Sequence, residues 1–332
     1  MSTIKDVARL AGVSASTVSR ALSNRVFVEE ETRQRVLKAV EELNYKPSLM
    51  AKGLREGRSY TIALLVPDIN SLFYPTVMKC VERYAAQSGY SIILCNSNED
   101  IECERKNLEM LASRGIDGVL CMSVEDDIRH ILAFERAHKI PVVLVNRDFQ
   151  ADISCIAVDN AYGGYLMTKY LLDQGHRRIA GMFGDIGRQR FRERCTGCKR
   201  ALEEYGVEES KRFFVYNVSS IEEAFGHTME LLGRADRPTA FFASMDVLAI
   251  GIYSGLSHSG LRIPEDVSVA GFDNLFMTQY MTPPLTTYNE PVERLSKRAV
   301  ECLVNRIENR GPVEREILRG ELVVRDSVKN VR

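Results

Sequence analysis

Tryptophan is absent from this chain of 332 residues, and so is any run of about 18 uncharged apolar residues. The second absence excludes a membrane-spanning helix, and an N-terminus that contains Lys5 and Asp6 does not resemble a signal peptide. We therefore expect a cytoplasmic protein with no membrane partner. The first absence excludes an indole ring as the platform for a sugar face.

Enzyme and metal signatures are absent too. The chain has no G-x-G-x-x-G, P-loop, H-E-x-x-H or G-x-S-x-G motif, and its five histidines form no evident triad. Cys195 and Cys198 form a C-x-x-C pair, but no second pair lies at the spacing of a zinc site. Most of the eight cysteines lie in apolar runs, which is typical of reduced thiols in a large cytosolic chain. The sequence predicts a protein that is not an enzyme and that binds no metal or cofactor.

Charge is distributed unevenly along the chain. The formal net charge is −1, yet residues 1–58 carry 11 Lys and Arg against 7 Asp and Glu, which leaves −5 for the rest. A basic segment is a candidate for contact with the phosphates of DNA, although a solvated basic face has the same composition. An apolar content of 45% with 27% charged residues is typical of globular proteins, and the length fits two or three domains.

The N-terminal residues have the pattern of two short helices. Apolar residues recur at three and four positions from Ile4 to Ala11 and again from Val18 to Leu22, with Gly12 and Ser14 in between as a helix breaker and an N-cap. Two such helices joined by a short turn form a helix-turn-helix, whose second helix can enter the major groove of DNA. Any small helical subdomain could show the same spacing. The residues facing outward on the second helix are small or form hydrogen bonds, and Arg20 suits a guanine edge.

A third helix and a linker follow. Apolar residues on one face predict a helix from Thr32 to Leu43, and Pro47 ends the helical headpiece. Ser48 to Leu54 is too short to form a stable helix alone.

The rest of the chain alternates between short apolar runs and helical segments, which predicts parallel sheets covered on both faces. Ten strands over about 230 residues fit two doubly wound lobes better than one sheet. The predicted strands are residues 62–66, 91–95, 118–122, 142–146, 155–158, 179–183, 213–216, 240–243, 267–272 and 285–288.

The ends of these strands are rich in Asp, Asn and Arg, and in open α/β sheets ligands bind beyond the carboxyl ends of the strands. Asn146 and Arg147 follow one strand, Asp273 another and Glu290 a third. Such side chains suit a small polyhydroxylated or heterocyclic ligand, although Asp and Asn at these positions often only cap the next helix.

The N-terminal pattern resembles that of the lactose-repressor (LacI/GalR) family of bacterial transcription factors. The family pattern T-I-x-D-V-A-x-x-A-x-V-S-x-x-T-V-S-R is matched from Thr3 to Arg20, and the similarity continues through Val28 to Arg33 and Tyr45 to Leu54. The resemblance implies a DNA-binding headpiece at residues 1–46, a hinge helix and linker at 47–59, and a two-lobed domain like periplasmic sugar-binding proteins at 60–332. It implies a first lobe of about 60–160 and 291–318, and a second of about 161–290 and 319–332.

The family also implies residue roles. Leu54 matches the leucine that the hinge helix inserts into the minor groove. The residues expected at the DNA are Thr3, Ser14, Ala15, Ser16, Thr17, Ser19, Arg20, Tyr45 and Leu54.

For the effector, Arg194 and Gly197 resemble the family's R-x-x-G segment, and Asp273 resembles its G-[YF]-D acid. Arginines at alternate positions near Arg194 would favour an anionic ligand if two or more point into the site, but a solvated loop is an equal alternative. Ser71 and Glu290 depart from the family's usual proline and glutamine, and a carboxylate at 290 would repel an acidic ligand unless an arginine pairs with it. The residues expected at the effector are Leu72, Phe73, Asn146, Arg147, Arg188, Arg190, Arg194, Phe242, Asp273 and Glu290.

The resemblance therefore implies a homodimeric repressor whose affinity for a near-palindromic operator is controlled by a small molecule, a sugar or sugar derivative such as a sugar acid or phosphate. No leucine heptads occur from Val323 to Arg332, so the tetramer of some family members is not expected. The competing hypothesis is a cytoplasmic sugar-binding protein or sugar enzyme with a helical appendage.

Overall fold

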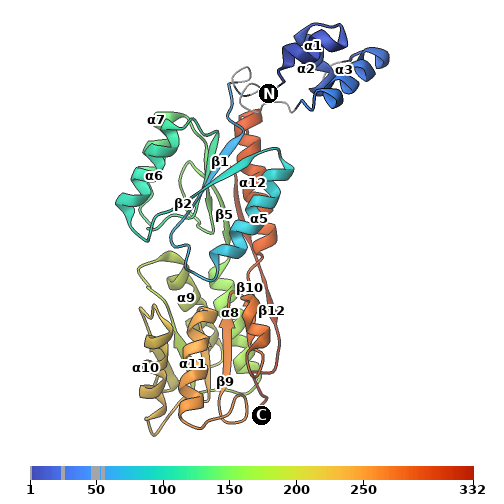
Figure 1. Ribbon diagram of the computed structural model, residues 1–332. Coiled ribbons are helices and arrows are strands. Elements are labelled where there is room, and N and C mark those ends of the chain that lie inside the picture. Colours follow the sequence, from blue (N-terminus) through green and yellow to red (C-terminus); the bar gives the residue numbers. More distant parts are fainter. Residues whose placement is uncertain (1, 24–26, 46–52, 54–56) are drawn as a thin grey trace. The chain divides into compact units, whose positions relative to one another are not determined.

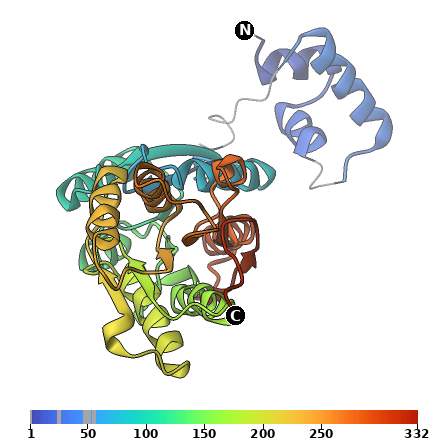
Figure 2. The same ribbon diagram turned by 90° about the horizontal axis from the view of Figure 1, so that it is seen from below.

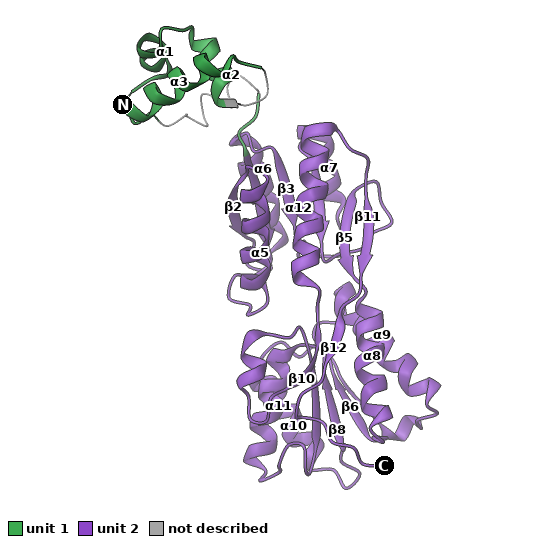
Figure 3. Cartoon of the chain, turned by 90° about the vertical axis from the view of Figure 1, so that its right-hand side faces the viewer, with its two compact units in different colours: residues 1–60 green, residues 61–332 purple. Residues whose placement is uncertain are grey.

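The computed structural model describes residues 2–23, 27–45, 53 and 57–332, in two compact units, Met1–Tyr60 and Thr61–Arg332 (Figure 3). Leu54 and most of the expected linker lie outside the described residues. The role of Leu54 as a minor-groove wedge therefore stays a prediction.

The first unit is built from three helices around a small core. They are α1 (Ile4–Ala11), α2 (Ala15–Ser23) and α3 (Glu30–Glu42). Each contributes one fully buried valine: Val7, Val18 and Val36. The third helix begins two residues before the expected Thr32, because the acidic side chains of its first turn interact favourably with the positive end of the helix dipole.

The second unit contains two sheets of six strands (Figure 1). The apolar pattern predicted the two lobes and ten of these strands. The first sheet has the order β11-β5-β4-β3-β1-β2 and the second β12-β10-β9-β8-β6-β7, and every pairing is parallel except that of β12 with β10. The first sheet consists of β1 (Thr61–Val66), β2 (Ser91–Asn96), β3 (Gly118–Cys121), β4 (Val142–Val145), β5 (Ser154–Val158) and β11 (Arg315–Leu318). The second consists of β6 (Ile179–Met182), β7 (Arg212–Val215), β8 (Ala240–Ala243), β9 (Ser268–Phe272), β10 (Thr286–Asn289) and β12 (Glu321–Val323).

Helices cover both faces of each sheet (Figures 1 and 2). In lobe one, the first sheet and its helices, α5 packs with α12 on one face and α6 with α7 on the other. In lobe two, α8 packs with α9 and α10 with α11. Their bounds are α5 (Tyr74–Gln87), α6 (Ile101–Ser113), α7 (Arg129–His138) and α12 (Val292–Asn309), then α8 (Asn160–Asp173), α9 (Gln189–Glu204), α10 (Ile221–Leu232) and α11 (Asp246–His258). Two 3₁₀ segments, η1 (Glu209–Lys211) and η2 (Phe276–Tyr280), complete lobe two.

The chain passes between the lobes three times, after β5, after β10 and after β11. Strands β11 and β12 were missed in the sequence, because they are short edge strands with charged residues rather than continuous apolar runs. The crossings place the carboxyl ends of β4, β9 and β10 at the junction of the two lobes, where the site described below lies.

Candidate effector cleft and DNA-binding surface

Side-chain caps fix the start of the first two helices. Thr3 donates its N–H and its hydroxyl to the Asp6 carboxylate, at 2.9 and 2.7 Å. Gly12 has a φ of 66° and ends α1, and the Ser14 hydroxyl accepts the Thr17 N–H at 3.1 Å. The turn between α1 and α2 is thus set locally, as in a helix-turn-helix.

The outward face of α2 carries Ser16 and Arg20, which are exposed and four residues apart, while Val18 is buried. Thr17 and Ser19 are half-buried beside them. Ala15, placed on the outer face from the sequence, is half-buried against the core of the unit, because its methyl group is apolar. Tyr45 packs against the same core.

Polar side chains from both lobes meet at the lobe junction around a cavity of about 50 Å³. Because one cavity joins the residue after β4 and the start of α5 to residues of α9 and the loop after β9, a ligand held there would contact both lobes. Its lining residues are Ser71, Phe73, Tyr74 and Asn146 of lobe one, with Arg190, Arg194, Met245, Val247, Asp273 and Leu275 of lobe two.

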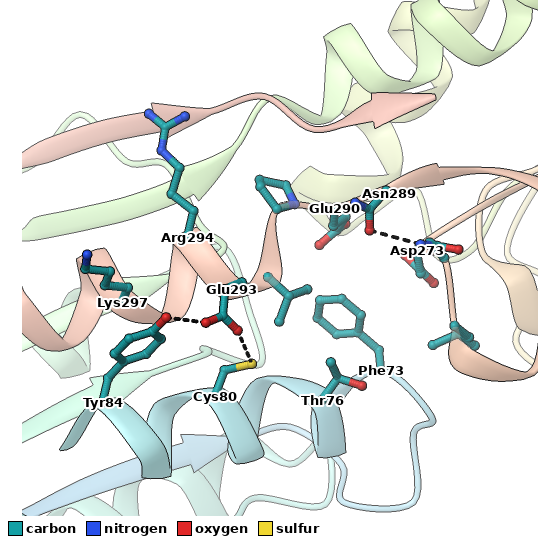
Figure 4. A pocket seen from close by; sticks show the side chains of 14 residues that line it. Phe73, Thr76, Cys80, Tyr84, Asp273, Asn289, Glu290, Glu293, Arg294 and Lys297 are labelled. Atoms are coloured by element: carbon teal, nitrogen blue, oxygen red, sulfur yellow. Dashed lines mark hydrogen bonds between the residues drawn. The ribbon is translucent and has the colours of Figure 1, made fainter. Parts of the chain in front are cut away.

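A larger cavity of about 530 Å³ adjoins the first (Figure 4). Phe73, Asp273 and Leu275 line both spaces. The outer one is further bounded by α5, by the start of α12 and by Asn274, Asn289 and Glu290 of lobe two. Glu293 of α12 accepts hydrogen bonds there from the Tyr84 hydroxyl and, at 3.3 Å, from the Cys80 thiol. The outer cavity is wide enough to extend the ligand space of the inner one.

Arg194 is the most highly connected side chain of the site. It is 3% exposed, and its guanidinium lies 3.6 Å from the centre of the Phe272 ring. It forms a salt bridge with Asp273 at 3.2 Å and another with Glu290. It also donates to the Asn160 amide oxygen at 2.8 Å and to the Ser244 carbonyl at 2.6 Å. The guanidinium therefore ties α8, α9 and the ends of three strands together.

Two glycines allow α9 to bring Arg194 into this position. A Cβ atom on Gly197 would lie 1.9 Å from the Ala161 carbonyl oxygen, and one on Gly164 would lie 2.1 Å from that of Arg194. No side chain fits at either point, so the backbones of α8 and α9 are in direct contact. The glycine of the R-x-x-G segment thus has a packing role one turn from the arginine.

The two carboxylates that face Arg194 are buried. Burial raises the pKa of Glu290, and it raises the pKa of Asp273 well above the usual range, with Arg194 opposing the effect in both cases. Asp273 has a φ of 113°, a strained conformation that is concentrated at functional sites. Glu290 also accepts the Asn146 side-chain N–H at 3.3 Å across the lobes. Arg194 thus pairs with Glu290. Under this condition the Glu290 carboxylate would not repel an acidic ligand.

Residues 188–192 act mainly as a contact between the lobes. Arg188 binds Glu99 of lobe one through two hydrogen bonds, at 3.0 and 3.1 Å. Arg192 pairs with Asp126 at 2.9 Å, and Gln189 donates its N–H to the same carboxylate at 3.2 Å. Arg188 was expected to contact the effector, but its guanidinium is paired with Glu99. The position of Glu99 opposite Arg188 depends on how the two lobes pack.

The remaining candidates are scattered. Phe73 lines both cavities, whereas Leu72 is exposed and lines neither. Phe242 is fully buried in β8 and packs edge-on against Phe183, away from both linings, so the structure places it in the core. Tyr74 was missed, although its position beside Phe73 at the start of a helix was a signal for it.

Metal and thiol chemistry find no support in the described residues. Among them, no group of three or more His, Cys, Asp or Glu side chains could hold a metal ion. Cys195 and Cys198 are buried in α9, and burial raises the pKa of Cys198 to about 12. Across that same part of the chain, no helix has the length and apolar character needed to span a bilayer.

Two family models match the chain. Residues 3–48 match the bacterial regulatory proteins of the lacI family, and residues 59–323 match the periplasmic binding proteins and sugar-binding domain of the LacI family. The chain belongs to the LacI family.

Curated relatives support this assignment along the whole chain. The HTH-type transcriptional repressor PurR of Vibrio vulnificus is 39% identical, and that of Photobacterium profundum is 36% identical, each over 100% of both chains. The protein is accordingly a DNA-binding transcriptional repressor regulated by a small-molecule effector, and not an enzyme. These relatives reject the hypothesis of a sugar enzyme or binding protein with a helical appendage.

Solved structures agree. The lac repressor dimer bound to operator and the anti-inducer ONPF matches with a TM-score of 0.85 at 26% identity, over 99% of each chain. A LacI family regulator from Enterococcus faecium with bound ribose matches with a TM-score of 0.75 at 30% identity, over 82% of this chain and 100% of that one.

Proposed function

We propose that this repressor binds a near-palindromic operator as a homodimer, and that a sugar or sugar derivative in the interlobe cleft sets its operator affinity. The observation that supports the cleft is the cavity lined by both lobes, with Arg194, Asp273 and Asn146 at its wall. A ligand held by both lobes binds their closed arrangement better, and only such differential affinity can shift a conformational equilibrium. Because the protein acts on bacterial DNA, we place it in the cytoplasm, associated with the nucleoid when bound to its operator.

The chemistry of the cleft supports a hydroxylated ligand. Carboxylate and amide groups such as those of Asp273 and Asn146 bind hydroxyl groups, and Phe73 and Tyr74 add aromatic faces. Structural relatives contain bound ribose and D-xylulofuranose. The expected DNA contacts and effector contacts named from the sequence are part of this proposal.

Replacement of Asp273 by asparagine tests the cleft. We expect Asp273→Asn to bind operator without effector within about twofold of the wild type, since asparagine has a similar shape and tolerates positive φ. In the wild type we expect the effector to change operator affinity by 5- to 150-fold, about 1 to 3 kcal/mol. Asp273→Asn should lose this response. The measurement is an operator titration with and without a sugar found by thermal-shift screening.

Asp152→Asn is the matched control, because Asp152 is an exposed carboxylate on the loop between β4 and β5 of lobe one. It should respond to effector as the wild type does. If Asp273→Asn still responds at the wild-type effector concentration, the effector site lies elsewhere.

The dimer proposal is supported by exposed apolar side chains on both lobes. Phe276 and Tyr280 of η2 are 73% and 75% exposed, and Leu94 is exposed on the edge strand β2. Such side chains are commonly covered by a partner, and a two-fold interface would match the symmetry of a palindromic site.

We expect Phe276→Asp to separate the dimer. Light scattering after size exclusion should show the mass of one chain instead of two, and operator affinity should fall by about 100-fold or more because two linked half-site contacts become one. Val324→Asp places the same charge on an exposed apolar residue near the C-terminus and should leave the dimer intact. A dimeric Phe276→Asp protein would mean that η2 is not part of the interface.

A further inference from the structure

Arg147 is a buried cation that forms no salt bridge with any residue described in the structure. It is 3% exposed, and its guanidinium donates to the Ser123 carbonyl oxygen, from Nη2 at 2.8 Å and from Nε at 3.3 Å. The Nη1 atom has no hydrogen-bond partner among the described residues. A buried charge is costly unless it is paired and its donors are satisfied. Arg147 therefore lacks an acceptor that a ligand could supply.

A second cation faces it from lobe two. Arg190 donates to the Tyr74 hydroxyl at 3.1 Å, and it lines the inner cavity with Tyr74 and Asn146. Burial lowers the pKa of Arg147 to about 10, and the charge of Arg190 is the next largest cause. Arg147 directly follows Asn146, which lines the inner cavity together with Arg190, so the two positive charges oppose each other across the lobe junction.

The nearby acids are already paired. Arg192 binds Asp126, and Arg188 binds Glu99. Asp273 and Glu290 both bind Arg194. Arg190 and Arg194 of the inner cavity and the neighbouring Arg147 therefore share two buried carboxylates, Asp273 and Glu290, and both carboxylates form their salt bridges with Arg194.

Unused acceptors lie beside these cations. Of the five buried side-chain atoms without a partner in the described residues, three belong to this junction: Nη1 of Arg147, Oδ1 of Asn146 and Oε1 of Gln189. Acceptors next to donors suit a ligand that combines hydroxyl groups with a negative charge. Buried polar atoms in folded proteins are normally satisfied, so this cluster indicates a ligand rather than packing.

We propose that the effector carries an anionic group, a carboxylate or a phosphate, which binds between Arg147 of lobe one and Arg190 of lobe two. This inference rests on the proposed role of the cleft as the effector site. Without ligand, the two arginines oppose closure of the lobes. An anion between them attracts both guanidinium groups and so replaces their repulsion by attraction. The anion therefore binds the closed arrangement of the lobes more tightly than the open one.

The test uses the full-length protein and sulfate as the probe, compared with chloride at equal ionic strength. At ten times its Kd, sulfate should raise the Tm of the wild type by about 2–5 °C above chloride. Sulfate also stabilises proteins non-specifically. The decisive comparison is therefore between the Tm increase of the wild type and the smaller Tm increase expected for Arg147→Gln and Arg190→Gln. Arg129→Gln removes the same charge from an exposed arginine paired with Asp127, and it should keep the full increment.

Matched ligands then separate the anion types: ribose with ribose 5-phosphate, and glucose with gluconate. We expect the phosphate or the acid to bind at least about 10-fold more tightly than its neutral parent in the wild type but not in Arg147→Gln. Arg147→Lys, which keeps the charge, should restore part of the difference.

Two results would overturn the inference: no sulfate increment over chloride in the wild type, or an Arg147→Gln protein with a lower Tm in chloride but an unchanged increment. The second result would make Arg147 a structural residue. If a neutral sugar changes operator affinity through Asp273 while sulfate has no effect, the cleft function stands and the anion site fails. If anions bind through Arg147 without any change in operator affinity, the anion site stands and its regulatory role fails.

Discussion

Replacement of Arg194 by alanine is expected to lower the free energy of unfolding of the two-lobed unit by about 3 to 5 kcal/mol, because it leaves a buried ion-pair network without its cation. Asp273 and Glu290 would both stay in the interior, and the Asn160 amide and the Ser244 carbonyl would each lose a donor. An unstable regulatory unit cannot be read as a specific loss of the effector response, so Arg194→Ala tests the charge network and not the effector site.

Urea unfolding at several pH values measures the effect. Burial already holds the pKa of both carboxyl groups above the usual range, and loss of Arg194 should raise both pKa values further. A carboxyl group with a raised pKa in the folded state binds protons more tightly there than in the unfolded state, so stability falls as pH rises above the unfolded pKa. The loss of unfolding free energy in Arg194→Ala, relative to the wild type, should therefore be larger at pH 8 than at pH 5.

Arg200→Ala serves as the control on the same helix. Arg200 is half-exposed and pairs with Glu204 at 3.7 Å, so its loss should cost no more than about 1 kcal/mol. Equal losses for the two variants, or a deficit that does not depend on pH, would contradict a buried charge network around Arg194.

The second large effect is expected at the DNA. Arg20→Ala should lose about 1 to 3 kcal/mol of binding at a single operator position, a 5- to 150-fold effect, because a bidentate contact to a guanine edge discriminates against other bases. Arg20 and Ser16 are exposed on the face of α2 opposite the buried Val18, as base reading requires.

Selection of binding sites from a random pool, with wild type and variant in parallel, measures this preference. Lys38→Ala removes the same charge from the exposed side of α3, and it should leave the preferred site unchanged. An unchanged preferred site for Arg20→Ala as well would reject Arg20 as a base reader, and a uniform loss over all sites would make it a phosphate contact.

Local features of this protein were determined by the sequence alone. Gly12 and Ser14 set the end of α1 and the start of α2, because a left-handed residue and an N-cap act within one turn of helix. The apolar runs determined the buried central strands, because a strand covered on both faces must be apolar throughout. The edge strands β11 and β12 obey no such rule, so their pairing was not predictable.

The partners of the charged residues were decided only by the tertiary structure. The resemblance set Arg194 apart, but spacing alone did not tell which of the neighbouring arginines point into the site. Arg188 binds Glu99, Arg194 binds Asp273 and Glu290, and Arg190 lines the inner cavity. An ion pair between residues far apart in sequence depends on where the two lobes place their strand ends. No local spacing encodes that distance, because several carboxylates of the chain are chemically equivalent until packing brings one of them within reach.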